Sequence, residues 1–306
     1  MKVKKIKIVL RSLRINQWTK NLAVFAPILF TGNLFDPSLF WVSFWVFVVF
    51  CFLSSSSYLL NDIVDAPLDR LHPLKKNRPV ARGDLPISSA VIISLGLLFL
   101  GLGLASFLSM GVFLMAGSFY LLHVGYSFLL KKLVLWDILT IAASFSIRAF
   151  AGEVATGYHL SIWLSFTVIF LSLFVAAGKR RSELVTEGDR TRPVLDKYQK
   201  SLLNFYVSIF SVSTLISYAL FTYFAPGEDF GTRLADRLGP SWDSLVGRKW
   251  LMLTLIPVLM GFMRYAYLIF SSRDGEQPEK ALTGDYTLLG TVLLWGAMLV
   301  FIMYII

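Results

Sequence analysis

Residues 39–70 read LFWVSFWVFVVFCFLSSSSYLLNDIVDAPLDR, and this stretch decides the fold class. Its first 22 positions contain no charged residue, whereas three aspartates lie among the last ten. A helix needs about 20 apolar residues to cross a hydrocarbon core of roughly 30 Å. The stretch therefore predicts a membrane-spanning helix that ends in a cluster of carboxylates.

The rest of the chain repeats the apolar pattern. Of its 306 residues, 56% are hydrophobic and only 16% are charged, which excludes a soluble globular protein with a polar shell. Backbone groups in lipid must be paired within their own segment, so each apolar segment is expected to be a helix. Nine such segments occur, at residues 22–35, 39–60, 87–108, 111–130, 133–155, 160–177, 202–224, 249–270 and 286–306. We therefore expect an all-α integral membrane protein, a single bundle of nine transmembrane helices in one domain over residues 1–306.

Lys and Arg predict the orientation, because they collect in short cytoplasmic loops. With the N-terminus inside, the inner segments hold 23 of the 29 basic residues and the outer segments hold four. The inner segments are 1–20, 61–86, 131–132, 178–201 and 271–285. Residues 1–20 lack the apolar core of a signal peptide and are expected to stay as a basic cytoplasmic segment. The pattern predicts a multi-pass protein of the inner (plasma) membrane with its C-terminus outside.

Acidic residues contribute little to orientation, so their concentration on the inner side needs another cause. Asn61 and Asp65 are four apart and Asp62 and Asp65 three apart, spacings that share a helix face. Carboxylate and amide oxygens are the ligands of Mg²⁺, which also bridges to substrate phosphates. We expect Asn61, Asp62, Asp65 and Asp69 to hold the metal, with Asp62 and Asp65 catalytic. Pro67 is expected to end the helix and turn Asp69 away. A solvated helix end is the alternative.

Basic side chains on the same predicted side of the membrane as these carboxylates are candidates for binding phosphates. They are Lys20, Lys75, Arg78, Lys131, Lys179 and Arg180, for each of which membrane orientation is the competing explanation. The segment 178–201 also carries Glu183 and Glu187, four apart on one helix face. The two glutamates form a second carboxylate pair on the predicted cytoplasmic side. We expect 61–86 and 178–201 to be cytoplasmic active-site loops of a single catalytic domain.

At these residues the chain resembles the UbiA superfamily of intramembrane prenyltransferases. Asn61, Asp62, Asp65 and Asp69 complete the superfamily's Asn-Asp-x-x-Asp-x-x-x-Asp motif. Further matches, to the branch that transfers phosphoribosyl groups to polyprenyl phosphates, are Gln17-Trp18-Thr19-Lys20-Asn21, His72-Pro73 with Lys75 and Arg78-Pro79, Tyr126-Ser127 with Lys131, Asp137, Arg148-Ala149-x-Ala151-Gly152, and Gly178-Lys179-Arg180 with Glu183-Leu184. Among these, Asp137 is expected to pair with a lysine, and Arg148 either to reach outward to the membrane surface or to face the bundle interior.

The resemblance implies a nine-helix, magnesium-dependent transferase. Its donor would be phosphoribosyl pyrophosphate and its acceptor a polyprenyl (decaprenyl-like) phosphate, with pyrophosphate released and the product used for arabinan precursors of the cell wall. The chain departs from typical members in one respect. Where they carry a second aspartate motif, it has Lys179, Arg180, Glu183 and Glu187. This departure favours the phosphoribosyl branch, because the donor's 5-phosphate and diphosphate would need two cationic clusters. With such a donor, Glu183 is expected to act in catalysis by orienting a base or the ribose hydroxyls.

Two other functions stay open on the sequence. A UbiA-type enzyme that moves an isoprenyl chain from its diphosphate to an aromatic acceptor differs only in its donor. A transporter would place ionisable residues near the membrane midplane, often within an internal repeat. Here these residues gather at one face and no repeat is evident. Membrane lipids are expected partners, nucleic acid is not, and the sequence leaves a homo-oligomer open.

Overall fold

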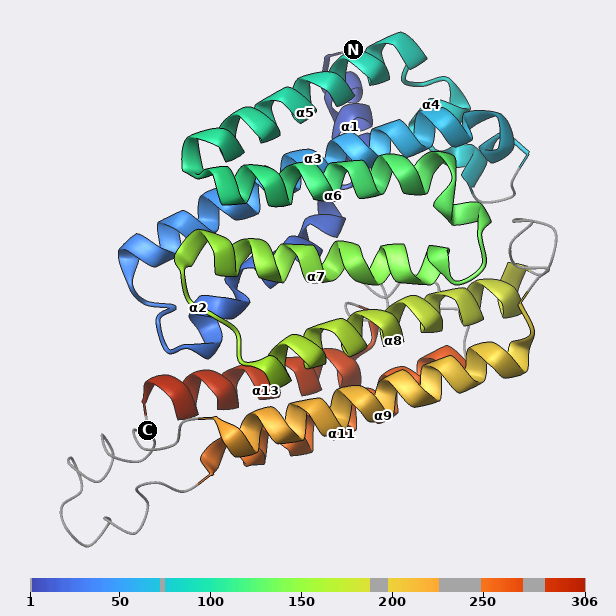
Figure 1. Cartoon of the computed structure of the whole chain (residues 1–306). Helices are drawn as coiled ribbons and strands as arrows, with labels where there is room; N and C mark the ends of the chain where they lie inside the picture. Colours follow the sequence, from blue (N-terminus) through green and yellow to red (C-terminus); the bar gives the residue numbers. More distant parts are fainter. Residues whose placement is uncertain (1, 72–74, 188–197, 226–248, 272–283, 306) are drawn as a thin grey trace, which may run out of the picture. The chain divides into compact units, whose positions relative to one another are not determined.

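The computed structural model describes residues 2–71, 75–187, 198–225, 249–271 and 284–305 (Figure 1). These residues form α-helices and short 3-10 helices, and none of them lies in a strand. They group into two compact units, one reaching from the N-terminus to His159 and the other beginning at Leu160. The all-helical prediction is confirmed, and a single catalytic domain stays a prediction.

The first unit contains seven α-helices and three 3-10 helices among its described residues. In chain order they are α1 (Lys2–Leu13), η1 (Ile15–Phe25), α2 (Ala26–Phe30), α3 (Pro37–Asp69), η2 (Lys75–Asn77), α4 (Pro79–Arg82), α5 (Ile87–Leu108), α6 (Met110–Phe128), η3 (Leu130–Lys132) and α7 (Trp136–Thr156). Helix α3 packs against α5, α6 and α7 (Figure 1). With 33 residues it is about 50 Å long, so it extends beyond the hydrocarbon core.

Segment η1 runs antiparallel along α3. Trp18 Nε1 donates to Ser55 Oγ at 3.0 Å, and Asn21 Nδ2 contacts Cys51 Sγ at 3.3 Å. Further along, the ring of Phe25 lies 6.1 Å from that of Phe47. As η1 advances, its partners therefore step back along α3. The chain leaves α1 at the carboxylate end of α3 and reaches the opposite end before α3 begins.

This arrangement differs from the helix expected at residues 22–35. Most of that range is the end of η1 and the five-residue α2, with Pro27 at the start of α2. A 3-10 helix rises about 2.0 Å per residue, so the 11 residues of η1 cover about 22 Å. Residues 16–21 of η1 read NQWTKN and are mostly polar, so hydropathy placed the start of the apolar segment only at residue 22.

Close packing of η1 on α7 depends on Gly152. A Cβ atom at this position would lie 2.0 Å from the carbonyl oxygen of Val24. Ala149 and Ala151 beside it are fully buried. The small residues of this motif thus let the backbone of η1 approach α7, which positions Trp18 and Asn21 against α3.

The second unit contains four long helices and one 3-10 segment among its described residues. They are α8 (Ile162–Glu187), α9 (Lys200–Phe224), η7 (Trp250–Thr254), α11 (Leu255–Ser271) and α13 (Tyr286–Tyr304). Helix α8 lies along α9, and α11 packs against α13. A buried cluster that includes Phe174, Val207 and Ile269 joins α8, α9 and α11.

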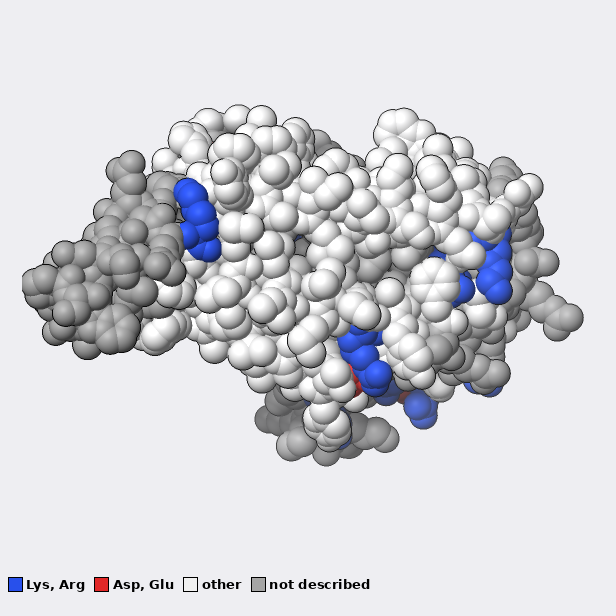
Figure 2. Space-filling model, turned by 90° about the horizontal axis from the view of Figure 1, so that it is seen from below, with Lys and Arg blue, Asp and Glu red and all other residues white. Residues whose placement is uncertain are grey.

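Eight helical segments of the described chain are long and apolar enough to cross a membrane. Large apolar side chains such as Phe99, Phe107 and Leu121 are at least 70% exposed on them. The face in Figure 2 is mostly free of Lys, Arg, Asp and Glu across its described surface. Lipid is the solvent that suits such a surface, so the chain is a multi-pass membrane protein.

Candidate active site

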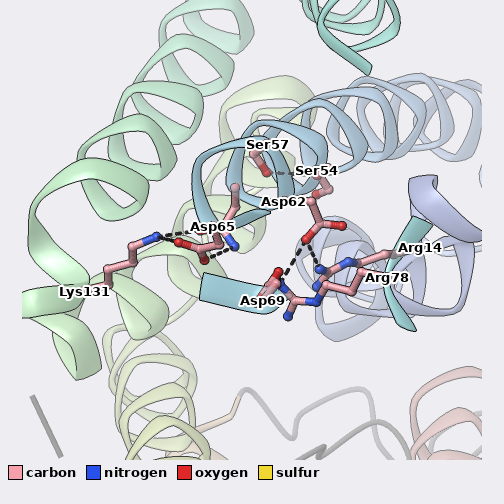
Figure 3. Close-up of polar contacts among 9 residues, drawn as sticks. Arg14, Ser54, Ser57, Asp62, Asp65, Asp69, Arg78 and Lys131 are labelled. Carbon is pink, nitrogen blue, oxygen red and sulfur yellow. Dashed lines mark hydrogen bonds and ion pairs between the residues drawn. The ribbon is translucent and has the colours of Figure 1, made fainter. Parts of the chain in front are cut away.

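The candidate site lies at the C-terminal end of α3, where helix geometry divides four polar residues into two pairs. Residues seven apart on an α-helix differ by about 20° in direction and residues four apart by about 40°. Asp62 and Asp69 therefore point to one side, and Asn61 and Asp65 to another. Figure 3 shows Asp62 and Asp69 turned toward Arg78, and Asp65 turned toward Lys131. Asp62 is 2% exposed and Asp69 4% exposed, so both carboxylates are withdrawn from water.

One arginine nitrogen lies between Asp62 and Asp69. Arg78 Nη1 is 3.1 Å from Asp62 Oδ1 and 2.7 Å from Asp69 Oδ2. Arg78 has an extended backbone and caps α4, whose first residue is Pro79. Proline fixes the start of the helix, and the residue before it is restricted to extended conformations. Pro79 thus holds the backbone of Arg78 in the extended conformation from which its side chain reaches the two carboxylates.

A second cation, Arg14, contacts the same carboxylate. Its Nη2 forms an ion pair with Asp62 Oδ1, and its guanidinium lies 5.1 Å from the ring centre of Tyr58. Arg14 separates α1 from η1 and has a left-handed backbone, with φ of 52°. Such a conformation costs an L-residue about 1–2 kcal/mol. The guanidinium groups of Arg14 and Arg78 therefore neutralise Asp62 and Asp69, and the backbone of Arg14 is strained.

Lys131 neutralises the other pair. Its Nζ, in η3, lies 2.5 Å from Asp65 Oδ1 and 3.2 Å from Asn61 Oδ1. Asn61 Nδ2 also donates to Asp65 Oδ2 at 3.0 Å, which fixes the amide beside the carboxylate. The structure therefore brings together six predicted residues: Asn61, Asp62, Asp65, Asp69, Arg78 and Lys131.

The expectation that Pro67 ends the helix and turns Asp69 away is wrong. Helix α3 continues through Pro67 to Asp69, and the N–H of Arg70 still donates to the carbonyl of Ala66 at 3.2 Å. Pro67 lies in the last turn, so it removes only one backbone hydrogen bond there. Asp69 consequently stays on the face of Asp62.

Arg148 lies inside the first unit. It is 2% exposed, its Nε donates to Asn21 Oδ1 at 2.6 Å, and its guanidinium lies 4.6 Å from the ring centre of Phe119. Of the two expected positions, the interior one is confirmed. Since Ser54 Oγ also donates to Asn21 Oδ1 at 3.3 Å, this polar cluster ties η1, α3 and α7 together.

At the end of α8, within the second unit, the basic residues have different partners. Arg180 is fully buried and pairs with Glu183 of the same helix. Arg181 Nε donates to Asn204 Oδ1 at 2.7 Å, and its Nη1 donates to the carbonyl of Ile269 at 2.5 Å. Arg181 therefore joins α8 to α9 and α11.

The remaining predicted residues occupy separate places. Lys20 is in η1 and donates to Gln17 Oε1 at 3.2 Å. Lys75 is in η2, Tyr126 in α6, Lys179 in α8, and Asp137 is fully buried in the first turn of α7. Glu187 ends α8, but its side chain lies outside the described residues, as do His72 and Pro73. Lysine pairing of Asp137 stays a prediction.

The donor set fits a divalent cation that also binds phosphate. Within the described part of the chain, no group of three or more His, Cys, Asp and Glu side chains is arranged to hold a metal by itself. Mg²⁺, however, commonly uses one or two carboxylates and takes its other ligands from water and substrate phosphates. Asp62 and Asp69 already accommodate the positive charges of Arg14 and Arg78, and Asn61 adds an amide oxygen near Asp65.

Sequence reasoning missed Arg14 as a site residue. Arg14 is 48 positions from Asp62 and belongs to a basic segment that membrane orientation already explains. Its only distinguishing signal is its place just before the Gln17-Trp18-Thr19-Lys20-Asn21 motif. The left-handed turn that aims it at Asp62 has no sequence signature, because glycine or asparagine normally marks such a turn.

Comparison with known proteins gives a consistent picture. A model of the UbiA prenyltransferase family matches residues 22–290. A decaprenyl-phosphate phosphoribosyltransferase of Corynebacterium glutamicum is 33% identical over 97% of this chain and 86% of its own length. One of Mycolicibacterium smegmatis is 32% identical over 94% of this chain and 89% of its own. A UbiA homologue of Archaeoglobus fulgidus, solved with GPP and Mg²⁺, has a TM-score of 0.69 at 18% identity and covers 97% of this chain and 99% of its own.

Proposed function

The chain belongs to the UbiA prenyltransferase family, and we propose that it is a phosphoribosyltransferase of that family. Its donor is phosphoribosyl pyrophosphate and its acceptor a polyprenyl phosphate such as decaprenyl phosphate. The observation that carries this assignment is the near full-length similarity to decaprenyl-phosphate phosphoribosyltransferases, at 33% identity over 303 residues. The pairing of carboxylates and arginines at the end of α3 supplies chemistry that suits a diphosphate.

The reaction transfers the phosphoribosyl group by forming one bond and breaking another at the anomeric carbon. A phosphate oxygen of the lipid attacks the anomeric carbon of the ribosyl ring, while the bond from that carbon to pyrophosphate breaks and the electron pair leaves with pyrophosphate. The lipid phosphate is already an anion at neutral pH, so no protein nucleophile is required. The main demand on the protein is to stabilise charge that grows on the leaving group.

The residues of α3 take the metal-binding role in this proposal. Asn61, Asp62, Asp65 and Asp69 would hold Mg²⁺, which when bound offsets charge on the pyrophosphate. Arg78 and Lys131, now paired with those carboxylates, are cations within reach of a diphosphate bound there. Lys20 and Lys75 remain predicted phosphate ligands. Lys179, Arg180 and Glu183 remain the predicted second cluster, for the 5-phosphate and the ribose.

The membrane arrangement belongs to the same proposal. Since η1 and α2 run from the carboxylate end of α3 back to its start, we count them as a ninth crossing beside the eight long helices. An odd number of crossings puts the termini on opposite sides. With 23 basic residues on the inner segments, the N-terminus and the α3 site face the cytoplasm and the C-terminus faces outward.

Cysteine labelling tests this orientation. In a Cys51→Ala background, single cysteines replace the exposed residues Ser88 or Ser201, and Ser161 serves as the outside control. An impermeant maleimide added to intact cells should label the control and spare the other two. Labelling of Ser88→Cys or Ser201→Cys at the rate of the control contradicts the orientation.

A donor assay tests the function. Purified protein is incubated with labelled phosphoribosyl pyrophosphate, Mg²⁺ and a panel of polyprenyl phosphates that differ in length and saturation. Label should enter the lipid phase, with one pyrophosphate released per lipid product. If the protein ignores this donor and instead joins an isoprenyl diphosphate to an aromatic acceptor, the prenyltransferase alternative replaces the proposal. The use of the product in arabinan precursors of the cell wall is part of what is proposed.

A further inference from the structure

Arg14 combines a strained backbone with a contact to a buried carboxylate. Among the described residues other than glycine, only Arg14 and Leu135 have a positive φ. Strain of this kind persists where surrounding contacts over-determine it, and it concentrates at functional sites. For Arg14 the contacts are the ion pair with Asp62 and the stacking on Tyr58. If Asp62 acquired another partner, the main contact that holds Arg14 in this conformation would be lost.

The charges around Asp62 are balanced without a metal. Asp62 and Asp69 face the guanidinium groups of Arg14 and Arg78, two anions against two cations. Both arginine side chains are 23% exposed, whereas the two carboxylates are almost fully buried. The arginines are therefore the partners that can move into solvent, and the carboxylates are fixed.

A metal and Arg14 compete for the same oxygens. A divalent cation that binds Asp62 meets the positive charge of Arg14 at contact distance, and like charges at such distances repel strongly in a partly buried site. A phosphate removes this repulsion, because guanidinium binds phosphate oxygens in paired hydrogen bonds. Metal alone should therefore bind weakly, and metal together with a diphosphate should bind well.

We propose that Arg14 is an exchangeable counter-ion and a donor-binding residue. It neutralises Asp62 while the site holds no donor, and it passes to the donor's diphosphate when the metal takes Asp62. The exchange makes the binding of metal and diphosphate cooperative, and it keeps the site from filling with metal alone. The inference rests on the proposed function only in taking a diphosphate as the donor's leaving group.

Mn²⁺ binding to the purified full chain in nanodiscs measures the cooperativity between metal and diphosphate. Electron paramagnetic resonance reports bound Mn²⁺, first alone and then with inorganic pyrophosphate at a fixed concentration of free Mn²⁺. For the unaltered chain we expect pyrophosphate to tighten Mn²⁺ binding by about tenfold or more. In Arg14→Gln, Mn²⁺ alone should bind about tenfold more tightly, since the competing charge is gone. The enhancement by pyrophosphate should then fall below about threefold.

Arg11→Gln is the matched control, because it removes the same charge from the exposed surface of α1. It should change Mn²⁺ binding by less than about twofold. Arg14→Lys retains the charge and should keep Mn²⁺ binding weak. Unaltered or weaker Mn²⁺ binding in Arg14→Gln overturns the proposal. A variant that failed to fold would bind Mn²⁺ more weakly, so misfolding cannot imitate the tighter binding that we expect. Pyrophosphate is common to both donor classes, so the outcome does not depend on which donor the enzyme assay selects.

Discussion

The ends of α3 and α8 both gather charged residues, yet they hold them in different ways. At α3 the partners come from other elements: Arg14 follows α1, Arg78 precedes α4 and Lys131 lies in η3. At α8, Arg180 pairs within its own helix, and Arg181 bonds to Asn204 and to a backbone carbonyl. The cations at α3 are partly exposed, whereas Arg180 and Arg181 are buried. Charges that can exchange partners suit a binding site, whereas Arg181, which is bonded to α9 and α11, suits a structural joint.

The largest expected effect comes from the carboxylates of α3. Asp62→Asn or Asp65→Asn removes one charge with almost no change of shape, so each should lower kcat by about 100-fold or more. A chelator should abolish turnover of the unaltered enzyme, and added Mg²⁺ should restore it. The donor assay measures both effects, and the thermal unfolding transition serves as a check on folding. Turnover near that of the unaltered chain in both variants would show that Asp62 and Asp65 do not bind a catalytic metal.

The sequence predicted much of this picture for physical reasons. Hydropathy reports which segments prefer lipid, so the expected segment 87–108 coincides with α5 and 286–306 nearly coincides with α13. The spacing of Asn61, Asp62, Asp65 and Asp69 predicted a polar helix end, because helix periodicity is local. The partners of these residues depend on chain reversals far away in the sequence. Neither the left-handed turn at Arg14 nor the inward position of Arg148 has a local cause.

A second test asks whether Arg181 is structural, as its partners indicate. Arg181→Met leaves Asn204 and the carbonyl of Ile269 without a buried donor, which should lower the free energy of unfolding by about 2–4 kcal/mol. The donor's KM in the folded fraction should stay unchanged. Arg78→Gln is the counterpart at α3, and it should raise the donor's KM about tenfold. A donor's KM that rises in Arg181→Met and stays unchanged in Arg78→Gln would contradict the contrast between the two arginines.

A third test addresses the predicted role of α8 in donor binding. The double variant Lys179→Gln/Arg180→Gln removes two positive charges and should raise the donor's KM several-fold more than the lipid's KM. A donor analogue without the 5-phosphate should show a smaller change. The control Arg180→Gln/Glu183→Gln removes the ion pair without altering net charge. Equal KM effects in both double variants would mean that the end of α8 contributes only packing.

The smallest expected effect concerns Asp285, a carboxylate with a structural role. It caps α13 through the N–H of Leu288 at 2.8 Å and pairs with Arg264 Nη2 at 2.7 Å. The hydrogen bond from Arg264 and that from Leu288 hold the pKa of Asp285 below its usual range. A lowered pKa in the folded state stabilises the protein above the ordinary aspartate pKa, and this contribution is lost as the pH falls through the folded-state value.

Asp285→Asn should therefore lower Tm slightly at pH 7 and remove part of the loss of Tm on acidification. Asparagine still caps a helix, so the difference isolates the ion pair with Arg264. Asp36→Asn is the matched control, because Asp36 caps α3 through Ser38 and Leu39. Added salt should shrink the effect at Asp285 more than the effect at Asp36, since screening weakens a partly exposed ion pair more than a local hydrogen bond. Turnover should be unaffected by Asp285→Asn, in contrast to Asp62→Asn. A loss of turnover as large as that of Asp62→Asn would mean that Asp285, at the start of α13, also takes part in catalysis.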